Sequence, residues 1–140
     1  MCSSDLMERK QPDLVLIVAR SFATKLATPT VIIDARGDLV YFNDAAADVL
    51  GRSYLDVGAL RASRWQELFE PRTLDEQPLT AEQTPGGVAL LERRPVHDSF
   101  AMRGLDGREH EITVTAFPLF SHPDEVVGAM SIFWELPAAP

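Results

Sequence analysis

The histidines are the first side chains in this sequence that could do chemistry, because imidazole nitrogens bind metal ions and carry protons. The chain has three of them, His97, His110 and His122. Their spacing matches no ligand motif, and no cysteine lies among them, since Cys2 is the only one. We therefore predict no metal site and expect the three histidines to be exposed on strands and loops.

Three other features could support catalysis or binding, and each has a simpler interpretation. Ser131 has no base near it in sequence, so a nucleophile is not indicated. Asp75 and Glu76 lie in a loop-forming segment, where solvated carboxylates are expected. The pair Arg93 and Arg94 is interpreted as solvated rather than anion-binding. No nucleophile, base and orienting group converge on one motif, so we predict no catalytic residues and no enzyme activity.

The composition indicates one globular domain and excludes several kinds of partner. A chain of 140 residues, 46% hydrophobic and 24% charged, can bury a core of ordinary size. Its net charge of −8 argues against nucleic acid, because nucleic-acid binders need a clustered basic face. No segment approaches the ~20 apolar residues of a membrane span. Without such a span, we expect no membrane binding. The single cysteine excludes an internal disulfide, which fits a reducing compartment, so we expect a cytoplasmic protein.

The first element that would position these residues is an N-terminal helix. Residues 1–10 are polar and are expected to be a disordered tail. In residues 11–29, Pro12 suits the first helical position and Pro29 ends the helix. Apolar side chains recur there at spacings of three and four and form a stripe of Val15, Val18, Phe22 and Leu26. Such a stripe packs either on its own domain or against a second copy, and the spacing alone does not decide which.

A β-hairpin with a tightly attached helix follows. Residues 31–34 and 39–42 are predicted strands, joined by a turn that contains Gly37. Asn43 has the features of a helix N-cap, whose side chain accepts a hydrogen bond from the first turn. The helix then ends at Gly51, a residue suited to the position after a helix.

The remaining chain is predicted to form short helices and then three antiparallel strands. Residues 52–79 are irregular apart from a short helix at 64–69. Thr80 with Gln83 resembles a capping box, which would start a helix that ends near Arg93. Beyond it the apolar period changes to two, and strands are expected at 96–104, 108–118 and 126–135, the first two joined by the Asp106–Gly107 turn.

This order of elements and three of its segments resemble a PAS domain. LVYFNDAAADVLG resembles the pattern of a strand, an Asn, small residues and a helix that ends in Leu-Gly. PLTAEQTPGGVALLERRPV resembles the helical segment before the third strand, and LDGREHEITVTAFPLF with DEVVGAMSIFWE resembles the paired strands that close the sheet. The resemblance covers roughly residues 30–135. It implies an α+β fold, with a five-stranded antiparallel sheet, short helices on one face and an N-terminal helix. The domains would be a tail (1–10), a helix (11–29), the PAS domain (30–136) and a second tail (137–140).

The resemblance also implies a sensory or regulatory module of signal transduction. Its helices and curved sheet would surround a small central cavity that binds an apolar ligand, and the domain could also signal through dimerisation. The alternative is a ligand-free protein–protein interaction domain with a filled core. The exit from Trp134 to Pro137 departs from the Asp-Ile-Thr-like exit of PAS domains that feed a kinase or cyclase. This departure puts an attached output domain in doubt and leaves a separate signalling protein, for example in transcription regulation, as a possible partner.

Alternation of side chains along the strands, together with the resemblance, assigns an almost wholly apolar wall to the cavity. The expected pocket residues are Phe42, Phe100, Met102, Ile112, Val114, Ala116, Ala129, Ser131 and Phe133. Val31, Ile33 and Val40 are expected on the same face. The opposite face would carry Ile32, Leu39, Tyr41, Thr113, Thr115, Phe117, Met130, Ile132 and Trp134. That face is too apolar to stand in water, so we expect a homodimer whose interface contains Val15, Val18, Phe22, Leu26, Tyr41, Ile132 and Trp134.

Known PAS cofactors require side chains that this sequence lacks. Flavin-binding domains of the family need a pocket cysteine and amide side chains, at positions that are Met102, Ile112 and Phe133 here. Haem-binding members use an axial histidine on the helix placed here at 81–93, which contains none. We therefore expect neither flavin nor haem, but an apolar small molecule such as a fatty acid.

Overall fold

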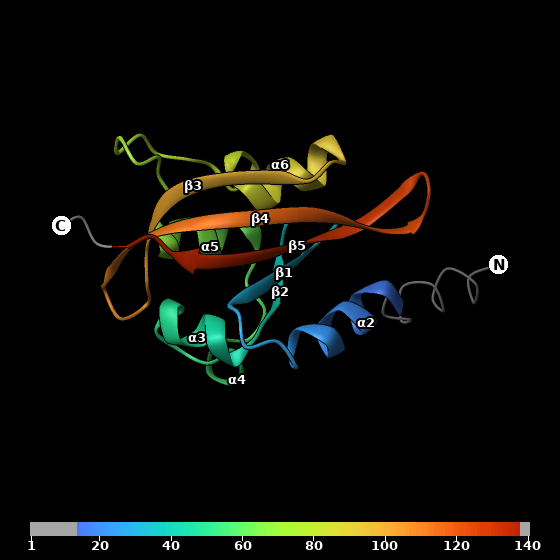
Figure 1. The fold of residues 1–140 in the computed structure, drawn as a ribbon, viewed down its shortest axis with the longest axis horizontal. Helices are drawn as coiled ribbons and strands as arrows, with labels where there is room; N and C mark the ends of the chain where they lie inside the picture. Colours follow the sequence, from blue (N-terminus) through green and yellow to red (C-terminus); the bar gives the residue numbers. More distant parts are fainter. Residues whose placement is uncertain (1–13, 138–140) are drawn as a thin grey trace.

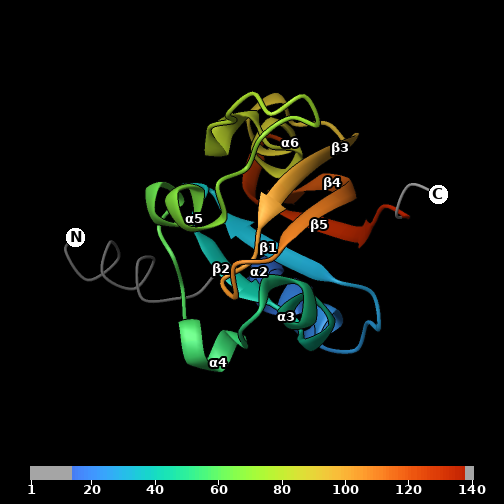
Figure 2. The same ribbon diagram turned by 90° about the vertical axis from the view of Figure 1, so that its left-hand side faces the viewer.

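The computed structural model describes residues 14–137, which form a five-stranded antiparallel sheet with helices on both faces (Figures 1 and 2). The helices are α2 (Leu14–Ala23), α3 (Asp44–Leu50), α4 (Tyr54–Val57), α5 (Ala62–Phe69), the 3-10 helix η1 (Ala81–Gln83) and α6 (Pro85–Glu92). The strands are β1 (Thr30–Asp34), β2 (Leu39–Phe42), β3 (Val96–Arg103), β4 (Glu109–His122) and β5 (Glu125–Glu135), in the sheet order β2-β1-β5-β4-β3. This is the α+β architecture expected from the sequence. The predicted tails fall outside the described residues, except for Pro137.

Two apolar cores lie on opposite faces of the sheet. The larger core lies between the inner face and helices α3 to α6, and Phe42, Ile112 and Phe133 are buried in it. The smaller core lies between the outer face and α2 and is built from Ala19, Ala23, Ile32 and Met130, with Leu16, Val40, Tyr41, Phe117, Leu119 and Ile132 packed around them. In Figure 1, α2 runs below the sheet and α6 lies above it. Of the two packings that the apolar stripe allowed, the structure therefore shows the helix on its own sheet, where it covers part of the outer face.

The N-terminal helix ends earlier than predicted, at Ala23 rather than near Pro29. The chain leaves the helix in a turn, in which Lys25 N–H bonds to the Phe22 carbonyl and Leu26 N–H to the Ala23 carbonyl, and the side chain of Asn43 holds this end. Its Nδ2 donates to the carbonyl oxygens of Ala23 (3.0 Å), Leu26 (3.3 Å) and Thr28 (3.0 Å). A distant amide thus adds donors for carbonyls at and after the end of the helix, which lack intrahelical partners.

Asn43 also caps α3, as predicted. Its Oδ1 accepts from the backbone N–H of Ala46 at 3.0 Å, and the same oxygen accepts from Thr30 N–H at 3.0 Å. The helix ends at Gly51, which has a φ of 91°. One buried side chain therefore joins the end of α2, the start of β1 and the start of α3.

Val40 is the extra residue of a β-bulge, and it corrects one part of the predicted face assignment. The register of β1 and β2 pairs Ile32 with Tyr41 but Ile33 with Leu39, so Val40 is skipped. Leu39 consequently packs in the larger core, and Val40 packs in the smaller one. Strict alternation had assigned these two residues to the opposite faces, and a bulge breaks that alternation.

The segment predicted as one helix over residues 80–93 forms two. The capping box of Thr80 and Gln83 is present, but it starts only η1. Thr84 then caps a second helix, α6, which begins at Pro85. A residue that precedes proline avoids the helical conformation, so the chain breaks at Thr84.

Other boundaries differ by smaller amounts. Helix α4, capped by the Ser53 side chain, lies in a segment predicted to be irregular. Strand β4 continues to His122, because its pairing with β5 resumes beyond a bulge between Leu119 and Phe120. The predicted short helix at 64–69 is present as α5 and is two residues longer at its start.

The segment after α5 covers the free edge of β3. The backbone of Arg72 exchanges two hydrogen bonds with Ala101, of 2.9 and 2.8 Å. The Arg72 side chain pairs with Glu109 of β4, and Arg103 of β3 pairs with Glu70 at 3.0 Å. These contacts protect an edge strand and hold the end of α5 against the sheet.

Candidate functional site

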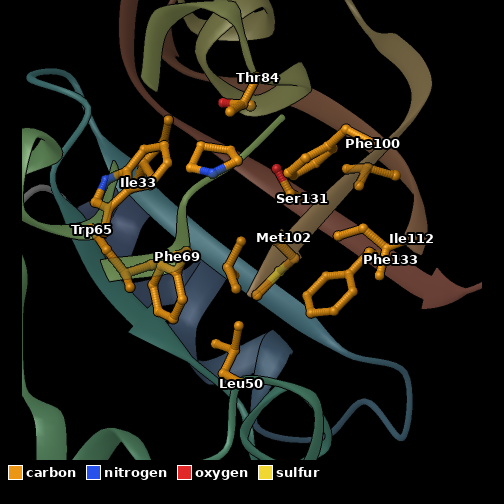
Figure 3. Close-up of a pocket in the computed structure, with 15 residues that line it drawn as sticks. Ile33, Leu50, Trp65, Phe69, Thr84, Phe100, Met102, Ile112, Ser131 and Phe133 are labelled. Atoms are coloured by element: carbon orange, nitrogen blue, oxygen red, sulfur yellow. The ribbon is translucent and has the colours of Figure 1, made fainter. Parts of the chain in front are cut away.

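A cavity of about 90 Å³ lies in the larger core, between the inner face of the sheet and the helices (Figure 3). It is lined by Val31, Ile33, Leu39, Leu50, Trp65, Phe69, Pro71, Thr84, Gly86, Phe100, Met102, Ile112, Val114, Ser131 and Phe133. Strands supply one wall, and α3, α5 and α6 with the residues beside them supply the other. None of these residues carries a charge, so the site is suited to an uncharged molecule.

Three of the lining side chains carry polar groups. Trp65 donates from Nε1 to the carbonyl oxygen of Gly37 at 2.9 Å. The Thr84 hydroxyl donates to the Ala81 carbonyl at 2.7 Å and accepts from the backbone N–H of Gly87 at 3.3 Å. The polar groups of Trp65 and Thr84 are therefore already hydrogen-bonded to the backbone. The hydroxyl of Ser131 is the third polar group on the cavity wall.

Six of the nine predicted pocket residues line this cavity: Phe100, Met102, Ile112, Val114, Ser131 and Phe133. Phe42, Ala116 and Ala129 belong to the surrounding core without lining the cavity. Val31 and Ile33 line it as expected for their face. Leu39 also lines it, and Val40 does not, because of the bulge in β2.

The helical wall was not predicted from the sequence. It comprises Leu50, Trp65, Phe69, Pro71, Thr84 and Gly86. Strand alternation cannot find these residues, because it places side chains only on the sheet. The spacing of Trp65 and Phe69, four residues apart on α5, is the signal that could have indicated a shared buried face.

His110 is half-buried rather than exposed, and its expected exposure is therefore wrong. Its side chain is 9% exposed, and its Nδ1 lies 3.3 Å from Oε2 of Glu135. The contact lacks hydrogen-bond geometry, so neither ring nitrogen has a hydrogen-bond partner within residues 14–137. The cause is register: His110 pairs with Met102, which places both side chains on the inner face at one end of the sheet.

The other histidines, acids and arginines that the sequence singled out are exposed as expected. His97 contacts the Thr115 hydroxyl at 2.7 Å, and His122 lies in the exposed end of β4. Asp75 and Glu76 are in an exposed loop, and Arg93 and Arg94 follow α6 at the surface. Within residues 14–137, no group of three His, Cys, Asp or Glu side chains lies close enough to hold a metal ion.

The predicted interface residues divide into packed and exposed groups. Tyr41 and Ile132 are half-buried in the smaller core, and Val15 and Leu26 are half-buried on and after α2. Val18 (59%), Phe22 (55%) and Trp134 (45%) are exposed. Leu14 and Ile17 are exposed beside Val18, so the outer surface of α2 is apolar.

Arg20 of α2 makes cation–π contacts with two tyrosines. Its guanidinium carbon lies 4.6 Å from the centre of the Tyr41 ring and 5.4 Å from that of Tyr54. The two rings contact each other edge-on at 5.2 Å, and Tyr54 also contacts Phe42. Burial raises the pKa of the Tyr41 hydroxyl above its usual value, and the charge of Arg20 partly opposes that shift. The cluster links α2 to the core around the cavity.

The helices of residues 14–137 are all too short or too polar to cross a membrane.

Comparison with known proteins identifies the fold. A family model described as PAS fold matches residues 24–138. No curated protein matches the sequence.

Similar solved structures agree in fold. One is the PAS domain of a protein from Colwellia psychrerythraea, with 15% identity and a TM-score of 0.60 over 87% of this chain and 97% of that chain. Another is the PAS domain of the fruit-fly ELK potassium channel, with 16% identity and a TM-score of 0.67 over 88% of this chain and 98% of that chain. A third is the LOV protein of Rhodobacter sphaeroides, with 12% identity and a TM-score of 0.67 over 88% of this chain and 68% of that chain. With the family match over most of its length, the chain belongs to the PAS family, whose domains are typically sensory rather than catalytic.

Proposed function

We propose that this chain is a sensory module of signal transduction, whose core cavity binds a small apolar molecule and whose α2 helix pairs with a second copy. The observation that carries the proposal is the uncharged cavity of about 90 Å³ inside a core that is otherwise packed. Native proteins leave few voids larger than a water molecule, because a void loses dispersion contacts along its walls. An uncharged hollow of this size in the core is a site that a small apolar molecule can fill.

The cavity volume limits the ligand. An engineered apolar cavity of ~150 Å³ accepts benzene, and sites for drug-sized ligands measure roughly 300–1,000 Å³. The cavity of this protein is smaller than both, so a whole fatty acid requires the helical wall to move. Flavin and haem are larger still, and Met102, Ile112 and Phe133 offer no hydrogen bonds to a flavin edge. We accordingly propose a compact ligand and neither of these cofactors.

Two contacts could carry the state of the cavity to α2. Leu50, at the end of α3, lines the cavity, and Asn43 at the start of α3 holds the carbonyls at the end of α2. Tyr54, which packs against the larger core, lies against Arg20 of α2. A shift of α3 or α4 on ligand binding therefore moves groups that hold α2 in place.

The small volume supports a second candidate function, a ligand-free interaction domain. A core with only a small void needs no ligand to be stable, and signalling would then depend on pairing alone. Both candidates place the protein in the cytoplasm, with a separate signalling protein as the output partner, for example in transcription regulation. Neither candidate function requires a catalytic group.

A native mass spectrum of freshly purified protein separates these functions. The ligand-binding module is expected to carry additional mass of an apolar compound that is lost under denaturing conditions. Protein that carries no added mass, and gains none when compact apolar compounds are supplied, would favour the interaction domain. The same spectrum reports whether the chain is a monomer or a dimer.

Pairing through α2 is proposed because one side of this helix packs on the sheet and the other side is apolar and exposed. Leu16, Ala19 and Ala23 pack on the sheet, so the exposed side of Val18 and Phe22 has no cover within residues 14–137. A second copy presents the same apolar surface, and two-fold pairing is the commonest way to bury it. Burial of each such side chain contributes roughly 1.5–3 kcal/mol before the entropy of association is met.

The double variant Val18→Asp, Phe22→Asp is expected to be monomeric at micromolar concentration, where the wild-type chain is dimeric. Two carboxylates in an apolar interface oppose association because they lose hydration. Light scattering measures the mass, and circular dichroism checks that the variant remains folded. Leu55→Asp, at a 95% exposed site on α4, is the matched control for replacing an exposed apolar side chain by a carboxylate. A wild-type chain that is already monomeric would refute the dimer, and a variant that stays dimeric would place the interface elsewhere.

A further inference from the structure

The hydroxyl of Ser131 differs from the other polar groups on the cavity wall. Ser131 is a buried residue of β5 that lines the cavity, and none of the side-chain hydrogen bonds of residues 14–137 involves its Oγ. Thr84 and Trp65 already use their polar hydrogens on backbone carbonyls. The Ser131 hydroxyl is therefore reachable from the cavity and is available to a hydrogen-bonding atom of an occupant.

Water is a poor partner at this position. A buried water molecule is held by two to four polar groups, usually about three. The side chains that line the cavity offer it only the Ser131 hydroxyl, and apolar groups such as Met102, Ile112 and Phe133 surround the remaining space. An occupant that is apolar except for one hydrogen-bonding atom satisfies both the hydroxyl and the wall.

The opposite wall leaves room next to this hydroxyl. Gly86 of α6 faces Ser131, and a Cβ atom on Gly86 would lie 2.9 Å from Ser131 Oγ. Because glycine has no Cβ, the space beside the hydroxyl stays open. Figure 3 shows Ser131 near Thr84 and Phe100 at one end of the cavity, with Leu50 at the other end.

We propose that the cavity selects compact, uncharged molecules that are apolar except for one oxygen or nitrogen, which forms a hydrogen bond with Ser131 Oγ. Scaled from the ~150 Å³ cavity that accepts six-carbon benzene, the volume suits about four carbon atoms. Short alcohols and ketones are the chemical class. This inference rests on the proposed function, since it names the ligand class of the same cavity.

The test compares 2-butanol with xenon in the whole chain. Backbone amide chemical shifts report 2-butanol binding, and xenon under pressure reports the apolar volume without a hydrogen bond. Ser131→Ala is expected to weaken the affinity for 2-butanol about five- to tenfold, because one hydrogen bond is lost, and to leave xenon binding unchanged. Ser99→Ala is the matched control, because the Ser99 hydroxyl lies on the outer face and bonds to the Thr113 hydroxyl at 2.9 Å. This variant is expected to change neither the affinity for 2-butanol nor the binding of xenon.

A second variant approaches the same contact from the other wall. Gly86→Ala places a methyl group beside the Ser131 hydroxyl and is expected to weaken the binding of 2-butanol. This variant tests the contact even if Ser131→Ala does not fold.

The outcomes separate this inference from the proposed function. Equal 2-butanol affinity in the wild type and in the folded Ser131 variant would overturn the role of Ser131 while leaving ligand binding in the cavity. Xenon binding without 2-butanol binding would overturn it as well. If neither probe perturbs residues of the cavity wall, both the inference and the ligand-binding function fail.

Discussion

Replacement of Asn43 by alanine is expected to lower the free energy of unfolding by about 3–4 kcal/mol. Loss of an N-cap side chain costs roughly 0.5–2 kcal/mol, and each buried polar group left unpaired costs roughly 1–3 kcal/mol, with incomplete additivity. Asn43 serves both purposes, since Oδ1 caps α3 and Nδ2 binds carbonyls at the end of α2. The variant loses the two hydrogen bonds that Oδ1 accepts, from Thr30 N–H and Ala46 N–H, and the two Nδ2 hydrogens that the carbonyls of Ala23, Leu26 and Thr28 share.

Urea unfolding of three variants apportions this loss. Asn43→Ser keeps a capping oxygen and removes the amide donors, so it is expected to cost about 2 kcal/mol. Ser53→Ala removes the cap of α4, which makes one exposed hydrogen bond of 3.3 Å, and is expected to cost less than about 1 kcal/mol. If Asn43→Ala is no more destabilising than Ser53→Ala, the side chain does not join the three elements.

Replacement of Gly87 by alanine is expected to cost about 3 kcal/mol or more. A Cβ atom there would lie 2.1 Å from the Ala81 carbonyl oxygen and 2.7 Å from the Cα of Glu82. Both neighbours are backbone atoms of η1, which cannot move aside without displacing that helix from α6. Overpacking of a buried position typically costs 1–3 kcal/mol, and backbone contacts on both sides place this site at the upper end.

The adjacent Gly86 is the matched control. Its added Cβ would meet the Ser131 side chain at 2.9 Å, which a rotation of that side chain can relieve. Alanine also favours a helix over glycine by about 1 kcal/mol, so Gly86→Ala is expected to change stability by less than about 1 kcal/mol. Thermal and urea unfolding of both variants provide the comparison. A Gly87 variant as stable as the Gly86 variant would show that η1 and α6 are not closely packed.

The sequence by itself determined the features that depend on neighbouring residues. The capping side chain of Asn43, the left-handed Gly51 and the Gly107 turn are settled within a few positions of the chain. The period of two beyond Val96 placed the last three strands. Family resemblance on these segments supplied the five-stranded antiparallel sheet and the existence of an inner face, from which six cavity residues followed.

Only the tertiary structure decided the features that depend on contacts between distant residues. The end of helix α2 at Ala23 is held by the side chain of Asn43, twenty residues away, which donates to the Ala23 carbonyl oxygen. Val40 changes face because the pairing with β1 skips it, and His110 is half-buried because of its register with β3. Local propensity contains neither the register nor the approach of two elements.

The size and polarity of the cavity also depend on contacts between distant residues. The volume is the small space left after the strands and helices have packed, and the identity of the strand side chains does not determine it. The free hydroxyl of Ser131 likewise results from what surrounds it, because Gly86 approaches from α6 without a side chain. The residue types could be read from the sequence, whereas the cavity depends on how closely segments far apart in the chain approach one another.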